Sequence, residues 1–200
     1  MSAYRKLSDD ELPAAAAIIT ETFLDISLRW LGLNDTRIDR RIVGANYLAM
    51  LQAITRDGFV AADDGLNAIA AWAAPPGAGS MVVEWRDTRV LRRAYREKFG
   101  WAWWWKMAQP KLTPHSVPHD PHAYLAYFAT RPTVRDNGHG SALLAATLRD
   151  MDTWKTPTYV NTISESAVRF YERHGFQIRE RVPATAVMPA AWGLWRDPPK

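Results

Sequence analysis

Apolar residues recur along the chain at two spacings, which divide it into alternating helices and strands. Intervals of three and four residues indicate amphipathic helices, and short apolar or alternating runs indicate strands. The predicted helices span residues 14–23, 37–56, 86–109, 138–151 and 164–174. The predicted strands span residues 4–7, 58–62, 67–74, 123–130, 158–162, 176–182 and 191–196. Residues 1–200 contain no internal repeat or linker, so we expect a single domain that combines helices with a sheet.

Local signals mark the boundaries of several of these elements. Ser8 and Glu11 have the spacing of a capping box ahead of the first helix, where Pro13 is tolerated only in the first turn. Asp-Asp-Gly at residues 63–65 predicts a hairpin turn between two strands. Residues 110–122 hold four prolines and three histidines and predict an irregular loop.

A glycine-punctuated loop follows the strand at 123–130 and opens the next helix. It reads Arg135-Asp136-Asn137-Gly138-His139-Gly140-Ser141. The first N–H groups of a helix have no intrahelical partner and carry about half a positive charge, and glycines let a phosphate approach them. The spacing Arg-x-x-Gly-x-Gly matches neither a Walker loop nor the dinucleotide fingerprint G-x-G-x-x-G. Taken alone, the loop predicts either a phosphate site or only a tight turn.

A second signature lies further along the chain. Residues 161–176 read Asn-Thr-Ile-Ser-Glu-Ser-Ala-Val-Arg-Phe-Tyr-Glu-Arg-His-Gly-Phe. Together, in order and separation, the two segments resemble the GNAT superfamily of acyl-CoA-dependent N-acetyltransferases. The residues that match the family's pyrophosphate loop are Arg135, Gly138 and Gly140. Those that match its later helix are Tyr171, Glu172, Gly175 and Phe176.

This resemblance implies a fold, a cosubstrate and a set of binding residues. The implied fold is an α/β/α sandwich of the α+β class, with a mixed, mostly antiparallel central sheet, a splayed strand pair and flanking helices. The implied acyl donor is acetyl-CoA, whose pantetheine arm would pair with the edge of strand 123–130 like an added strand. In the family, the tyrosine matched by Tyr171 protonates the departing thiolate. The implied cofactor-binding residues are Phe128, Ala129, Thr130, Arg135, Asp136, Asn137, Gly138, His139, Gly140, Ser141 and Tyr171.

The likeness extends to a subgroup similar to puromycin N-acetyltransferase. Residues 71–77 read Ala-Trp-Ala-Ala-Pro-Pro-Gly, an ending typical of this subgroup, and residues 192–196 stand where its last strand would be. This implies a small, apolar or aromatic amine as acceptor, such as an antibiotic or a toxic metabolite. We expect Trp72, Trp104 and Asn161 on the acceptor side.

Tryptophan is abundant, and four of the ten residues lie close together. Trp101, Trp103, Trp104 and Trp105 fall within five positions. Because one helical turn holds 3.6 residues, they do not share one face. A core-facing helix accounts for some of them, and the others must meet a ligand, a partner or a second layer.

Bulk composition limits the other functional classes. The net charge of +4, from 25 basic and 21 acidic residues, is accounted for by an anionic cofactor and does not require nucleic acid. The absence of cysteine excludes disulfides and thiolate zinc sites. No apolar stretch approaches the roughly 20 residues that span a bilayer. We therefore expect a cytoplasmic monomer or homodimer without a membrane partner.

The expected reaction needs a proton acceptor, because an amine attacks as its neutral base and a primary amine is mostly protonated at pH 7. The subgroup has a glutamate where Asn161 stands, and an amide does not accept a proton. Histidine titrates near neutrality, so we predict His122 as the catalytic replacement. The other candidates are His115, His119, Asp120, Glu84 and Glu21.

His115, His119 and His122 also have a metal-like spacing, but the prolines between them argue against a zinc site, and we predict no metal.

Three functions remain open. The first is a small-molecule N-acetyltransferase. The second is a GNAT-like protein that binds acyl-CoA with weak or no catalysis, which is suggested by Asn161 and by Ala167, where the family often has asparagine. The third is an N-acetyltransferase acting on a protein or peptide. The tryptophan-rich segment favours a compact hydrophobic acceptor and therefore the first function.

Overall fold

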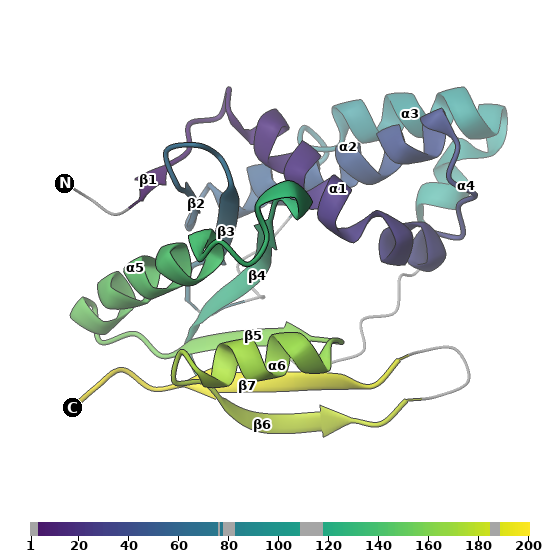
Figure 1. Cartoon of the computed structure of the whole chain (residues 1–200). Coiled ribbons are helices and arrows are strands. Elements are labelled where there is room, and N and C mark those ends of the chain that lie inside the picture. The colour runs from purple at the N-terminus through teal and green to yellow at the C-terminus, as the bar shows by residue number, and fades with distance from the viewer. Residues whose placement is uncertain (1–3, 76, 78–82, 109–117, 185–188) are drawn as a thin grey trace.

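The computed structural model describes residues 4–75, 77, 83–108, 118–184 and 189–200. Over these ranges seven strands form one sheet in the order β1-β2-β3-β4-β5-β7-β6 (Figure 1). The strands are β1 (Arg5–Lys6), β2 (Phe59–Ala62), β3 (Ala68–Ala73), β4 (Ala123–Thr130), β5 (Thr158–Thr162), β6 (Gln177–Val182) and β7 (Ala191–Arg196). Neighbouring strands are antiparallel except β4 and β5, which are parallel.

Helices cover both faces of this sheet. They are α1 (Leu12–Leu31), α2 (Arg37–Ile54), α3 (Arg89–Phe99), α4 (Trp103–Ala108), α5 (His139–Thr153) and α6 (Glu165–Glu172), with 3₁₀ turns η2 (Gly100–Ala102) and η3 (Pro132–Val134). In Figure 1 the purple and teal helices α1 to α4 lie together, while the green helices α5 and α6 lie in front of the strands. The expected α+β sandwich with a mixed sheet is confirmed.

Two apolar cores lie on opposite faces of the sheet. The first packs α1, α2 and α3 against β2, β3 and β4, and includes Val60 and Ile69. The second packs α5 and α6 against the sheet, and includes Trp72, Val160 and Leu194. Because side chains alternate along a strand, one strand serves both cores. The two cores therefore hold β4 from both of its faces.

The start of α2 carries a capping box that also anchors α3. Thr36 caps the helix through the N–H of Asp39, and the Asp39 carboxylate accepts from the N–H of Thr36 in return. Asp39 is fully buried and forms an ion pair with Lys98 at the end of α3. Burial opposes its ionisation, yet the bonds from Lys98, Thr36 and Asn34 hold the pKa of Asp39 below its usual value.

Some element boundaries differ from the expectation. Helix α1 begins at Leu12, because Ser8 donates to the Glu11 side chain and Glu11 is the N-cap. The predicted helix 86–109 is two helices. It breaks at Gly100, whose φ of 53° lies in the left-handed region that favours glycine.

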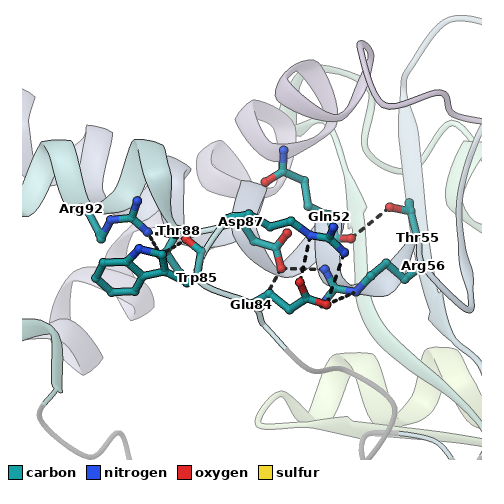
Figure 2. A network of polar contacts seen from close by, with 9 residues as sticks. Gln52, Thr55, Arg56, Glu84, Trp85, Asp87, Thr88 and Arg92 are labelled. Carbon is teal, nitrogen blue, oxygen red and sulfur yellow. Dashed lines mark hydrogen bonds and ion pairs between the residues drawn. The ribbon is translucent and has the colours of Figure 1, made fainter.

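A polar network attaches the segment before α3 to the end of α2. Figure 2 shows Arg56 between Glu84 and Asp87. Its guanidinium lies 2.7 Å from the carboxylate of Asp87 and 3.8 Å from that of Glu84. The guanidinium of Arg92 stacks 3.8 Å from the centre of the Trp85 ring. Charged contacts thus join the segment that leads into α3 to the chain just after α2.

No helix in the described ranges is long and apolar enough to cross a membrane.

Candidate active site

The parallel strands β4 and β5 pair only over their first residues. Ala123–Leu125 are the register partners of Thr158–Val160. Beyond these residues, β4 continues to Thr130 beside β3, and β5 continues to Thr162 beside β7. The two strands therefore separate after Leu125 and Val160. This is the splayed pair expected for the fold, and it leaves backbone groups of β4 available to an added extended chain.

A β-bulge in β4 lies where the two strands separate. Ala71 of β3 is paired with Tyr127, whereas the next residue, Trp72, is paired with Leu125, so Ala126 is an extra residue on β4. Both Ala126 and Tyr127 pack toward the first core. A bulge bends its strand and re-aims the side chains after it. It thus helps to turn the second half of β4 away from β5.

The glycine-rich loop lies at the far end of β4 and begins α5. Gly138 is the N-cap in the left-handed conformation, with φ of 82°, and no side chain caps the helix start. Gly140 is buried, and a Cβ there would lie 2.7 Å from the hydroxyl of Thr130. Glycine at this position lets the first turn of α5 approach the end of β4. The N–H groups of this helix start and the helix dipole favour an anion, and binding of a phosphate here stays a prediction.

Two side-chain contacts brace the loop. His139 Nδ1 lies 2.9 Å from Asp63 Oδ2 in the β2–β3 turn. Ser141 Oγ lies 2.9 Å from His174 Nε2, while His174 Nδ1 donates to the carbonyl of Phe170 in α6. Because Nδ1 donates to a carbonyl, Nε2 is the nitrogen that can accept from the Ser141 hydroxyl. The loop is thereby linked to the hairpin on one side and to α6 on the other.

Tyr171 lies near the end of α6, against the open part of β4. Its ring contacts those of Phe128, Phe170 and Phe176, with centroids 5.4–6.3 Å away. Burial, and then the neighbouring phenol of Tyr124, raise the pKa of Tyr171. A phenol with a raised pKa keeps its proton at neutral pH and so remains a donor.

The opposite face of β4 and β5 carries a group of polar aromatic side chains. Tyr124 donates from its hydroxyl to Asn161 Oδ1 over 3.2 Å. The ring of Tyr159 lies 5.9 Å from that of Tyr124, centre to centre, and the chain of contacts continues to His122 and Trp195. Burial raises the pKa of Tyr124 to about 12, despite its bond to Asn161. This face and Tyr171 therefore flank the point where β4 and β5 separate.

His122 lies at the closed end of the β4–β5 pair. It is fully buried, and its Nδ1 bonds to the carbonyl of Asp120 over 2.7 Å. Burial lowers the pKa of His122, so the ring is neutral at pH 7. Among the residues that the structure describes, its Nε2 has no hydrogen-bond partner, and it lies against Gly77, where a side chain would collide with the ring. The role of His122 as a base stays a prediction. The buried His122 ring explains why residue 77 is glycine, because a Cβ there would collide with it.

The predicted acceptor residues are not brought together. Asn161 lies beside Tyr124 at the separating strands. Trp72 is only 1% exposed in the second core, a place that packing alone accounts for. Trp104 is 56% exposed on α4, against Trp105. Contact of any of the three with an acceptor stays a prediction.

The other candidate bases lie in several places. Glu84 belongs to the network around Arg56, Glu21 is exposed on α1, and Asp120 pairs with Arg179. His119 is exposed, and His115 lies outside the described residues. Where residues are described, no three His, Cys, Asp or Glu side chains gather as a metal site requires.

Tyr124 and Tyr159 were missed by sequence reasoning. Tyr124 is the second residue of a strand that was predicted correctly, and Tyr159 is the second residue of the next. Nothing in either local sequence distinguishes these residues from ordinary strand aromatics. Their significance comes from the parallel register, which makes them Cα partners.

The comparisons with known proteins agree with this geometry. Residues 58–178, more than half of the chain, match the family model described as the Acetyltransferase (GNAT) domain. No curated protein matches the chain in sequence.

Several solved structures share the fold. "Histone acetyltransferase HPA2 and related acetyltransferase" from Corynebacterium glutamicum has a TM-score of 0.70 at 22% identity, covering 100% of this chain and 98% of that one. The ribosomal-protein-S18-alanine N-acetyltransferase from Escherichia coli has a TM-score of 0.52 at 14% identity, covering 98% and 94%. The C-terminal condensation domain of Ebony, in complex with beta-alanyl-dopamine, has a TM-score of 0.58 at 8% identity, covering 97% of each chain.

The larger part of the chain thus matches one family model. The same chain has a splayed strand pair, a glycine-rich helix start, and a helix, α6, that carries Tyr171. The general reaction of that family is N-acetylation with acetyl-CoA as the acyl donor. The chain belongs to the GNAT acetyltransferase family, a family of acyltransferases.

Proposed function

We propose that this protein transfers the acetyl group of acetyl-CoA to the amine of a small, apolar or aromatic molecule. The binding of acetyl-CoA is supported by one observation: the unpaired edge of β4 leads to the start of α5, which has no side-chain cap. An extended pantetheine arm would pair with Phe128, Ala129 and Thr130. The pyrophosphate would bind the N–H groups of residues 138–141, with Arg135, Asp136 and Asn137 at the loop rim.

Tyr171 is the proposed general acid. The amine nitrogen forms a bond to the thioester carbonyl carbon, the C–S bond breaks, and the proton of the Tyr171 hydroxyl passes to the departing sulfur. A phenol is a weak acid, so position matters more than acidity for this transfer. The aromatic neighbours of Tyr171 hold its ring, and its raised pKa keeps the proton in place until the thiolate forms.

The acceptor class is inferred from the aromatic face beside the separating strands. Tyr124 and Trp195, which are partly exposed, offer ring surfaces, and Asn161 offers an amide, while Tyr159 is buried beside Tyr124. Such a surface favours a flat or apolar molecule with few polar groups. The fold does not decide this, because the structural neighbours include proteins named as histone and ribosomal-protein acetyltransferases and a domain in complex with beta-alanyl-dopamine.

The proposal is tested by thiol release from acetyl-CoA with a panel of amines: tryptamine, puromycin, aniline and a peptide with a free N-terminal alanine. We expect turnover on one of the first three and coenzyme A binding in calorimetry. Tyr171→Phe should lower kcat by roughly 100-fold at pH 7 with unchanged coenzyme A affinity. Tyr4→Phe is the matched control, because the Tyr4 hydroxyl donates to Asp150 and this contact is not at the splayed strands.

Three outcomes would contradict parts of the proposal. Coenzyme A binding without turnover would favour a binding protein. Turnover on the peptide alone would replace the small-molecule acceptor with a protein. Gly138→Asp should abolish binding, because it puts a negative charge and a strained φ at the anion site, so unchanged binding would remove the loop from the cofactor site.

A further inference from the structure

The segment of residues 85–108 holds more than the whole net positive charge of the chain. It contains seven basic and two acidic residues, a balance of +5, against +4 for all 200 residues. The rest of the chain is therefore slightly acidic. In Figure 1, the helices α3 and α4 of this segment lie at the opposite edge of the molecule from α5. An anionic cofactor at the start of α5 does not account for a charge that is held at this edge.

Three arginines of α3 form one stripe on the outer face of the helix. Arg89, Arg93 and Arg96 are exposed, and spacings of four and three residues put them on one side of a helix. The opposite side, which carries Leu91 and Tyr95, is buried. Within the described ranges, no ion pair involves the side chain of Arg89 or Arg93. The stripe therefore presents positive charge to the surroundings of the protein.

Exposed apolar side chains are concentrated on the same segment and just before it. The described ranges contain nine large apolar side chains that are exposed, and six of them lie between residues 83 and 105. These six are Val83, Trp85, Val90, Trp101, Trp104 and Trp105. All four of these tryptophans are more than half exposed. The main positive charge and most of the exposed apolar surface thus coincide.

Contacts between guanidinium groups and indole rings show that the two kinds of side chain share one surface. The guanidinium of Arg92 lies 3.8 Å from the centre of the Trp85 ring, a contact that Figure 2 shows. The guanidinium of Arg96 lies 4.6 Å from the centre of the Trp103 ring. The rings of Trp85 and Trp103 are themselves 6.5 Å apart, centre to centre. Basic and aromatic side chains are therefore interleaved on this surface.

Anionic lipid headgroups match this combination of side chains. Indole rings are favoured at the boundary between headgroups and acyl chains, and the negative surface potential of a membrane attracts arginine and lysine. A nucleic acid strand would also meet arginine and indole, but Val83 and Val90 offer a base no ring to stack on. A second copy placed by two-fold symmetry would bring the arginine stripe against itself, and like charges repel.

We propose that residues 85–108 dock this protein on a membrane surface rich in anionic phospholipids. The arginine stripe of α3 faces the phosphate groups, and the rings of Trp101 and Trp105 enter the headgroup layer. The expectation of no membrane partner rested on the lack of an apolar span, and a surface contact needs no span. The contact is independent of the acetyl transfer proposed above.

The first test is flotation of the full-length protein with vesicles of phosphatidylglycerol and phosphatidylcholine in equal parts. Vesicles of phosphatidylcholine alone are the comparison. We expect binding to the anionic vesicles, roughly tenfold weaker binding to the neutral ones, and loss of binding as salt screens the headgroup charge. Equal binding to both kinds of vesicle, or binding to neither, would overturn the proposal.

A double variant tests the arginine stripe. Arg89→Gln with Arg93→Gln should bind the anionic vesicles roughly 30-fold more weakly, because two charges near the surface are lost. Arg149→Gln with Lys155→Gln is the charge-matched control, since both side chains are exposed near the end of α5. The control should bind as the wild type does. Equal losses in the two double variants would mean that net charge alone, and not this surface, attracts the protein.

A matched pair of tryptophan variants tests the aromatic part. Trp101→Ala should weaken vesicle binding roughly tenfold, because an indole ring no longer enters the headgroup layer. Trp154→Ala removes an exposed indole just after α5 and should leave binding unchanged. Circular dichroism checks that the variants are folded. Unchanged binding in folded Trp101→Ala would remove this indole from the contact and overturn the proposal as stated.

Two measurements distinguish the other occupants of this surface. Tighter binding to a single-stranded oligonucleotide than to the anionic vesicles, weakened by Arg89→Gln with Arg93→Gln, would assign the surface to nucleic acid. A dimer in analytical sedimentation that Trp101→Ala dissociates, without flotation of the wild type, would assign it to a second copy of the chain. Either result would overturn the membrane contact.

Discussion

The two halves of the sheet are covered differently. Strands β2 to β4 contribute to both cores, so helices pack against both faces, with α1, α2 and α3 on one and α5 on the other. Strands β5 and β7 contribute only to the core under α6, and β6 lies beside β7 at the edge of the sheet. Their other face carries Tyr159, Glu180 and Trp195, which are polar or aromatic. In the described ranges, helices therefore cover both faces of the first half of the sheet and one face of the second half.

The largest effect is expected from the buried ion pair that holds the first half together. Asp39→Ala should lower the free energy of unfolding by about 3–5 kcal/mol, because Lys98 loses its partner and α2 loses its capping box. Urea denaturation of the purified variant measures this. Glu97→Ala is the control, since Glu97 forms an exposed pair with Arg41 and should cost less than about 1 kcal/mol. Equal losses in the two variants would refute the role assigned to burial.

The same residue predicts how stability depends on pH. The folded-state pKa of Asp39 is lowered, so its contribution is present above the unfolded value of about 3.9 and is lost as pH falls through the folded value. The difference in stability between wild type and Asp39→Ala should therefore shrink below about pH 4. A difference that is constant down to pH 2 would contradict this linkage.

A smaller effect is expected where β4 meets the glycine-rich loop of residues 135–141. Gly140→Ala puts a Cβ 2.7 Å from Thr130 Oγ1 and forces the start of α5 away from β4. We expect coenzyme A affinity to fall about tenfold, with about 1–3 kcal/mol of stability lost to overpacking. Gly32→Ala is matched to it: its φ of 62° makes it strained, but a Cβ there meets nothing within 4 Å. That control should lose stability and keep its coenzyme A affinity, as measured by calorimetry.

The strand, loop and helix of the proposed donor side could be predicted from the sequence because they are local. Strand, loop and helix follow one another from residue 123 to residue 153, and the glycines sit where a close approach requires them. The boundaries of β4, β5 and β7 were likewise predicted to the residue. Apolar runs and turn residues determine such features within a short window.

The proposed acceptor side could not be predicted in this way because it depends on register. Tyr124 and Asn161 are distant in sequence, and only the parallel pairing of β4 with β5 brings them within hydrogen-bond distance. The capping box at Thr36 and Asp39 has a readable spacing and was overlooked. The buried position of His122 has no local signal, since it results from packing against Tyr159 and Trp195.

The smallest effect is expected where the first half exposes aromatic surface. Trp101 is 87% exposed, so Trp101→Ala removes little buried area and should change the free energy of unfolding by less than about 0.5 kcal/mol. Trp103 is half-buried between Trp85 and Arg96, and Trp103→Ala should cost about 1–3 kcal/mol. Urea denaturation at two protein concentrations measures both. If Trp101→Ala instead destabilises the protein, and does so only at high concentration, then the exposed tryptophan is buried between two copies of the chain. The distinction between a covered and an open half would then hold for the monomer but not for the assembly.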